Sequence, residues 1–114
     1  MPYLLHPRAA LVAALCAATA AGLPAARAAG TGDGLELARS KNCLGCHQLD
    51  TKRVGPAYRS VAQRFAGDPG AVDKLQTAIR KGSIRQWGAV PMPAQTQVTE
   101  AEARQLAQWI LSLK

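Results

Sequence analysis

The sequence predicts an all-α domain of about four helices over residues 29–114, preceded by a leader at residues 1–28. Three observations lead to this prediction. Apolar residues recur three and four positions apart in several segments, which is the spacing of one helix face. Glycine and proline clusters separate these segments. No segment after residue 28 alternates apolar and polar side chains as a half-buried strand does.

The leader has the pattern of a secretory signal peptide. Arg8 precedes an apolar run over residues 9–21, and Ala26 and Ala28 supply the small residues of a cleavage site after Ala28. An uncleaved membrane anchor is the alternative, but the run is shorter than the roughly 20 residues of a spanning helix. We therefore expect export to the periplasm and a mature form, residues 29–114, without a membrane span.

The first three helices are marked by turn and cap residues. Asp33 is expected to cap a first helix that runs towards Asn42 and ends at a cysteine motif. A second helix is expected over residues 57–66, after a Gly-Pro turn. A third is expected over residues 71–81, and Gly82 ends it in the usual C-terminal glycine position.

The last helix has the clearest signals. Thr99 and Glu102 have the spacing of a capping box at its start. The residues that follow form an apolar stripe at helical spacing, made of Leu106, Trp109, Ile110 and Leu113. Helix packing explains Trp109 without any role in a functional site.

The cysteines give the most specific functional signal. Cys16 lies in the leader and is lost with it, so Cys43 and Cys46 remain, directly followed by His47. Two cysteines so close cannot join distant parts of a chain, whereas Cys-x-x-Cys-His is the pattern of c-type haem attachment. On one helical turn the two thiols reach the two vinyl groups of the porphyrin, and the histidine lies below the iron. We predict one covalently bound haem c per chain.

Two other uses of this motif fit the chain less well. A thiol-disulfide oxidoreductase uses Cys-x-x-Cys within a βαβ pattern, and no strand is expected here. A zinc site needs about four ligands, and residues 29–114 offer only Cys43, Cys46 and His47 among cysteines and histidines. A porphyrin also supplies apolar bulk to a short chain that keeps four aromatic residues after residue 28.

His47 is the expected lower iron ligand. Its Nε2 atom binds iron, and its other ring nitrogen donates to a backbone carbonyl that fixes the ring. The Gly55-Pro56 segment is the expected source of that carbonyl, with Pro56 holding it rigidly. The simpler interpretation, in which Pro56 only starts a helix, remains open at this point.

The long segment 83–98 holds the expected second iron ligand. It has no helix or strand periodicity, and loops longer than about 12–15 residues in small domains are usually functional. Met92 lies there between Pro91 and Pro93, where a core-filling methionine is not expected, so we predict that its sulfur binds the iron. Trp87 carries an N–H that needs a partner when buried, and a haem propionate is the expected acceptor.

Charge indicates the class of partner. The chain has a net charge of +7, and loss of Arg8 and Arg27 with the leader lowers it to +5. No basic run is interleaved with aromatic residues, so nucleic acid is not expected. Acidic proteins are the expected partners of a basic surface near the haem, which would be formed by Arg39, Lys41, Lys52, Arg53, Lys81 and Arg85.

These motifs together resemble the small bacterial class I cytochromes c of the cytochrome c-551 type. The resemblance covers nearly all of residues 29–114. It rests on the cysteine motif, on residues 54–58, on Trp87-Gly88 with Pro91-Met92-Pro93, and on residues 106–109. It implies the four-helix cytochrome c fold with the first and last helices crossing. It also implies that Pro56 supplies the carbonyl to His47 and that Trp87 donates to a propionate.

The chain departs from this family pattern at two positions. Relatives carry a propionate-binding arginine in the third helix where this chain has Ala78, and an asparagine after the methionine where it has Gln95. Both changes are expected to affect the reduction potential or its pH dependence, and neither removes an iron ligand.

With His47 and Met92 both bound, the iron has no vacant position. The sequence therefore predicts a monomeric electron carrier rather than an enzyme or gas sensor. Its expected donors and acceptors are redox proteins such as a quinol-oxidising complex, a copper protein, a nitrite reductase or a terminal oxidase.

Overall fold

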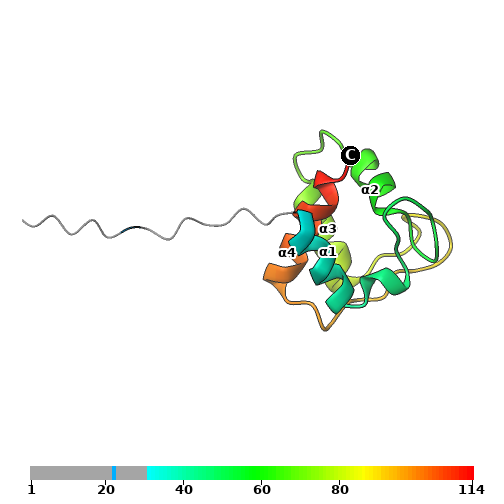
Figure 1. The fold of residues 1–114 in the computed structure, drawn as a ribbon. Helices are drawn as coiled ribbons and strands as arrows, with labels where there is room; N and C mark the ends of the chain where they lie inside the picture. The colour runs from blue at the N-terminus through cyan, green and yellow to red at the C-terminus, as the bar shows by residue number, and fades with distance from the viewer. Residues whose placement is uncertain (1–21, 23–30) are drawn as a thin grey trace, which may run out of the picture.

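The computed structural model describes residue 22 and residues 31–114 (Figure 1). The predicted cleavage site at Ala28, and the leader apart from Gly22, lie outside the described residues. The helices are α1 (Thr31–Ser40), α2 (Tyr58–Arg64), α3 (Ala71–Lys81) and α4 (Glu100–Ser112), with a short 3₁₀ turn, η1, at Cys43–Gly45. The all-α prediction is therefore confirmed. Among the described residues, no helix is long and apolar enough to cross a membrane.

Helix α4 is the centre of the fold and packs against α1, α2 and α3. Its start is fixed by the predicted capping box: Thr99 accepts from the Glu102 backbone N–H, and the Glu102 side chain accepts from the Thr99 N–H. Its buried face consists of Ala103, Leu106, Ala107, Trp109 and Ile110, and Leu113 of the predicted stripe lies just after the helix and is partly buried. Burying this face stabilises the domain because it removes apolar surface from contact with water.

Helices α1 and α4 cross closely because α1 carries a glycine at the contact (Figure 1). A Cβ atom on Gly34 would lie 2.0 Å from Cγ of Trp109. Carbon atoms that are not bonded normally approach to about 3.5–4.0 Å, so no side chain fits at position 34. The large indole of Trp109 fills the space that the glycine leaves.

The first two helices differ at their ends from the sequence prediction. Helix α1 begins at Thr31, so Asp33 lies within its first turn rather than at its cap. A carboxylate there still interacts favourably with the helix dipole. The helix ends at Ser40, and Asn42 (φ 61°) takes a left-handed conformation that turns the chain into η1. Helix α2 is shorter than expected, because Phe65 (φ −98°, ψ 8°) already leaves the helical conformation.

Two long connections complete the fold. Residues 46–57 link η1 to α2, and residues 82–99 link α3 to α4. The two connections approach one another on the side of the molecule away from the α1–α4 crossing (Figure 1). Within the described residues the only β-type pairing is a single antiparallel bridge between Ser83 and Met92. The predicted turn at Gly82 is present, with φ 79° directly after α3.

Candidate haem-binding site

A cleft lies between these two connections and is closed on its inner side by α2, α3 and α4. It encloses about 1190 Å³, including its open mouth. The cleft brings together all the residues that the sequence nominated, which are Cys43, Cys46, His47, Pro56, Trp87 and Met92.

The walls of the cleft are mainly apolar. Val61, Leu75, Ile79, Leu106 and Ile110 line its inner part. The described residues that line it include no Asp, Glu, Lys or Arg. A large, flat apolar group can therefore enter without burying an unpaired protein charge, which would be costly.

The geometry around His47 leaves one ring nitrogen available. Nδ1 lies 2.8 Å from the carbonyl oxygen of Pro56, which is the contact predicted from the sequence. A carbonyl oxygen can only accept, so Nδ1 is the donor, and in the neutral ring Nε2 is the nitrogen with the lone pair. The ring is also stacked on Tyr58, with centroids 4.9 Å apart and planes 14° from parallel. Nε2 is thus presented in a fixed orientation, as a metal ligand requires.

Gly55 allows this arrangement by having no side chain. A Cβ atom there would lie 2.5 Å from Cε1 and 2.8 Å from Nδ1 of His47. The Gly55 N–H donates to the carbonyl of Cys46 at 2.8 Å. This bond closes the connection on itself and places Pro56 beside the imidazole.

The two cysteines lie on and just after η1, and they are not joined by a disulfide. The backbone N–H groups of Cys46 and His47 both donate to the carbonyl of Cys43, at 3.2 and 3.0 Å. The motif therefore forms one tight turn. Burial raises the pKa of the Cys43 thiol, whereas the reactive cysteine of a thiol-disulfide enzyme has a lowered pKa. Cys43 therefore lacks the lowered thiol pKa that is typical of a redox-active cysteine.

Met92 is held on the opposite wall by its own backbone. Its N–H donates to the carbonyl of Ser83 at 2.8 Å, and its carbonyl accepts from the Ser83 N–H at 2.9 Å. The pair closes the loop between them and leaves the half-buried Met92 side chain lining the cleft. The proline on each side cannot donate a backbone hydrogen bond, so this pairing stops at Met92.

Trp87 lines the outer part of the cleft together with Gln86. The guanidinium carbon of Arg64 lies 4.5 Å from the Trp87 ring centroid. The same guanidinium donates to the carbonyl of Gln86 at 2.5 Å. The end of α2 therefore fixes the position of the indole. Ala78 and Gln95, the two positions that depart from the family pattern, also line the cleft.

The sequence reasoning did not identify the supporting roles of Tyr58, Gly55 and Arg64. The adjacent Gly55-Pro56 pair was a usable signal, since a glycine before a fixed carbonyl indicates a close approach. No sequence signal pointed to the contact between Tyr58 and His47.

Burial, with a further contribution from the nearby Cys43 thiol, raises the pKa of Tyr58 above its usual range. Its hydroxyl therefore stays neutral at physiological pH.

The donors in the cleft fit haem. One wall carries an imidazole with a free Nε2 and two thiols on a tight turn. The other wall carries a thioether sulfur. A haem iron takes an imidazole and a thioether as its axial ligands in many electron-transfer proteins. The apolar walls suit the porphyrin face.

Comparison with known proteins gives the same assignment. The model of the cytochrome c family matches residues 32–114. The chain is 57% identical to cytochrome c-552 of Hydrogenobacter thermophilus, over 69% of this chain and 80% of that one. It is 45% identical to cytochrome c-551 of Pseudomonas aeruginosa, over 89% of this chain and 96% of that one.

A solved structure is also similar. The crystal structure of Nitrosomonas europaea cytochrome c552 matches with a TM-score of 0.69 and 44% identity, covering 70% of this chain and 99% of that chain. The fold predicted from the resemblance is therefore confirmed. The chain belongs to the cytochrome c family, as a small class I cytochrome c that carries covalently bound c-type haem.

Proposed function

We propose that this protein is a periplasmic one-electron carrier that shuttles between donor and acceptor proteins of a respiratory chain. The observation that supports this most directly is the pairing of His47 and Met92 within one cleft. They come from two separate connections, and each is fixed by hydrogen bonds of its own segment. An iron ligated by both side chains has no position left for a substrate.

In this proposal each site residue has one task. Cys43 and Cys46 form the thioether links, and His47 and Met92 bind the iron. The carbonyl of Pro56 holds the His47 ring and strengthens its basicity. Trp87 donates its indole N–H to a haem propionate. When bound, the haem supplies the chemistry, which is a one-electron change of the iron.

The mouth of the cleft favours exchange of electrons with other proteins. Val54 and Val90 line the cleft, and their exposed fractions are 51% and 62%. Apolar side chains this exposed leave one edge of the cleft accessible to a docking protein. Because the His47 ring is hydrogen-bonded to the Pro56 carbonyl and the Met92 backbone is paired with Ser83, little reorganisation is expected when the iron changes charge.

Export supports the proposed location. Residues 1–28 have the pattern of a signal peptide cleaved after Ala28. The similarity to Pseudomonas aeruginosa cytochrome c-551 covers 89% of the chain, so it extends upstream of residue 32. Candidate partners in that compartment are a quinol-oxidising complex, a copper protein, a nitrite reductase and a terminal oxidase. The positive charge of the mature chain favours partners with acidic docking faces.

Replacing Met92 separates a carrier from a haem enzyme or gas sensor. In Met92→Ala the thioether is lost while Cys43, Cys46 and His47 remain, so the haem should stay attached. The potential should fall by a substantial part of the roughly 0.8 V that axial ligands span. The variant should also bind carbon monoxide and gain peroxidase activity, because a coordination position becomes free.

The matched control is Val90→Ala, which shortens another side chain that lines the cleft from the same loop. Its reduction potential should differ from that of the parent by only a small fraction of the shift seen in Met92→Ala. It should not bind carbon monoxide. If Met92→Ala kept the parent spectrum and potential, Met92 would not be a ligand. The enzyme or sensor interpretation would then be preferred.

A further inference from the structure

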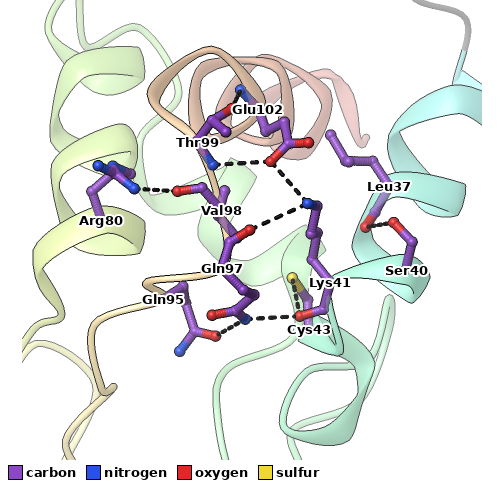
Figure 2. A network of polar contacts seen from close by, with 10 residues as sticks. All are labelled: Leu37, Ser40, Lys41, Cys43, Arg80, Gln95, Gln97, Val98, Thr99 and Glu102. Atoms are coloured by element: carbon purple, nitrogen blue, oxygen red, sulfur yellow. Dashed lines mark hydrogen bonds and ion pairs between the residues drawn. The ribbon is translucent and has the colours of Figure 1, made fainter.

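A chain of polar contacts connects the Met92 loop to the end of α1, just before the cysteine motif (Figure 2). The Gln97 amide nitrogen donates to the carbonyl of Lys41 at 3.0 Å and to the Gln95 side-chain oxygen at 2.8 Å. Both of its N–H groups are therefore used. The Gln95 amide in turn donates to the carbonyl of Pro93 at 2.8 Å, directly after Met92.

The contact between Lys41 and Gln97 is reciprocal. The Lys41 ammonium donates to the carbonyl of Gln97 at 3.2 Å and lies 3.0 Å from the Glu102 carboxylate. Lys41 is a partly buried side chain, with 24% exposed. Glu102 belongs to the capping box of α4. Figure 2 shows Lys41 extended between Gln97 and Glu102, so one residue joins the turn after α1, the loop and α4.

We propose that Lys41 and Gln97 form a latch that holds the Met92 loop closed, so that Gln97 sets how readily Met92 leaves the iron. This inference rests on the proposed ligation by Met92. The two ends of the latch differ in position: Lys41 is two residues before Cys43, and Gln97 is five residues after Met92. The latch therefore ties the covalently anchored side of the haem to the side that carries the exchangeable ligand.

The other hydrogen bonds of the Met92 loop leave one section, between Gln95 and Val98, where the latch is the contact to the rest of the domain. The Ser83 bridge fixes Met92 from the side of α3, and the Gln95 N–H donates to the carbonyl of Ile79 at 2.9 Å. The next fixed point is the fully buried Val98. Between Gln95 and Val98, the described side-chain contacts that reach the turn after α1 are those of Gln97. Opening that section would remove one of the attachments that hold the Met92 loop against the rest of the domain.

The test is the rate at which imidazole displaces Met92 in the ferric holoprotein. At high imidazole the rate levels off at the rate at which Met92 leaves. Gln97→Ala removes two hydrogen bonds at once, and a typical net bond corresponds to about a fivefold change in an equilibrium. We expect the limiting rate to rise about fivefold if one of these bonds breaks as Met92 leaves, and about 25-fold if both do. Gln97→Glu keeps the shape, loses both donors and should also raise the rate.

Gln76→Ala is the matched control. The Gln76 amide also joins two helices, since it contacts the backbone and side chain of Glu100 at 3.4 Å, but it takes no part in the chain from Met92. It should change the limiting rate by less than about twofold. If Gln97→Ala left the rate unchanged, or Gln76→Ala raised it equally, the latch would be wrong although Met92 would still be a ligand. If the rate of imidazole binding to the parent protein never levelled off at high imidazole and equalled the rate for Met92→Ala, then Met92 would not be a ligand. Both the ligation and the latch would then be wrong.

Discussion

Substituting Gly55 by alanine should displace the imidazole of His47. The new Cβ atom would lie 2.5 Å from Cε1, 2.8 Å from Nδ1 and 3.0 Å from Nε2 of the ring. Normal carbon contacts are about 3.5–4.0 Å, so the ring or the backbone must move by about 1 Å. The ring cannot move freely, because it is stacked on Tyr58 and hydrogen-bonded to Pro56.

The expected cost follows from the energetics of overpacking. Forcing one extra carbon into a packed site destabilises a protein by about 1–3 kcal/mol. In a domain of this size, that lowers the unfolding temperature by roughly 5–20 °C. A weaker Nδ1–H bond also makes His47 less basic, so ferric iron is stabilised less and the reduction potential should rise.

The assay is thermal unfolding of the holoprotein followed by circular dichroism, together with redox titration. Gly45→Ala is the matched control, because Gly45 lies in the same cysteine motif and a Cβ atom there meets nothing within 4 Å. Gly45→Ala should unfold close to the parent and keep its potential. Equal unfolding temperatures and potentials for Gly55→Ala and Gly45→Ala would refute the close approach described for His47.

Two further predictions concern contacts outside the iron ligands. Arg64→Ala should lose the contact with Trp87, which lowers the free energy of unfolding by about 0.5–1 kcal/mol for a cation–π pair. Arg64→Lys should retain part of this contribution. Equal stability of the parent and both variants in chemical unfolding would contradict the prediction. The Thr99 N–H and Lys41 lower the pKa of the Glu102 carboxylate, so its stabilising contribution is complete above the unfolded value of about 4.3 and is lost as pH falls through the lower folded value. In thermal unfolding, the deficit of Glu102→Gln relative to the parent should therefore be constant above about pH 5 and shrink below pH 4; a deficit that persists at pH 3 would rule out this linkage.

The sequence was sufficient to predict elements whose signals are local. Helix α3 has the predicted bounds because Gly70 and Gly82 flank a strongly periodic segment. The capping box of α4 needs only two residues three positions apart, and both of its hydrogen bonds are present. The contact between His47 and Pro56 was implied by the resemblance to the family, whereas the residue pattern alone left open whether Pro56 only starts a helix.

Features that depend on tertiary packing were not predictable in the same way. Asp33 has the chemistry of a cap, yet α1 begins two residues earlier. The latch joins Lys41 to Gln97, and the two residues have no shared motif that would indicate the contact. The cation over Trp87 comes from Arg64 at the end of another helix. Such pairs are set by how helices pack, and a single sequence contains no record of those distances.

Each wall of the cleft has hydrogen bonds of its own, in addition to the latch that joins the two walls. On the His47 side, Gly55 bonds to Cys46, and the N–H groups of Tyr58 and Arg59 donate to the carbonyls of Gln48 and Leu49 at 2.9 and 3.1 Å. On the other side, the Ser83–Met92 pair closes its own loop. A cofactor held between two walls that are each fixed by hydrogen bonds meets ligands that are already in place. For a one-electron carrier this matters more than tight binding alone, because ligands that need not move lower the barrier each time the iron changes charge.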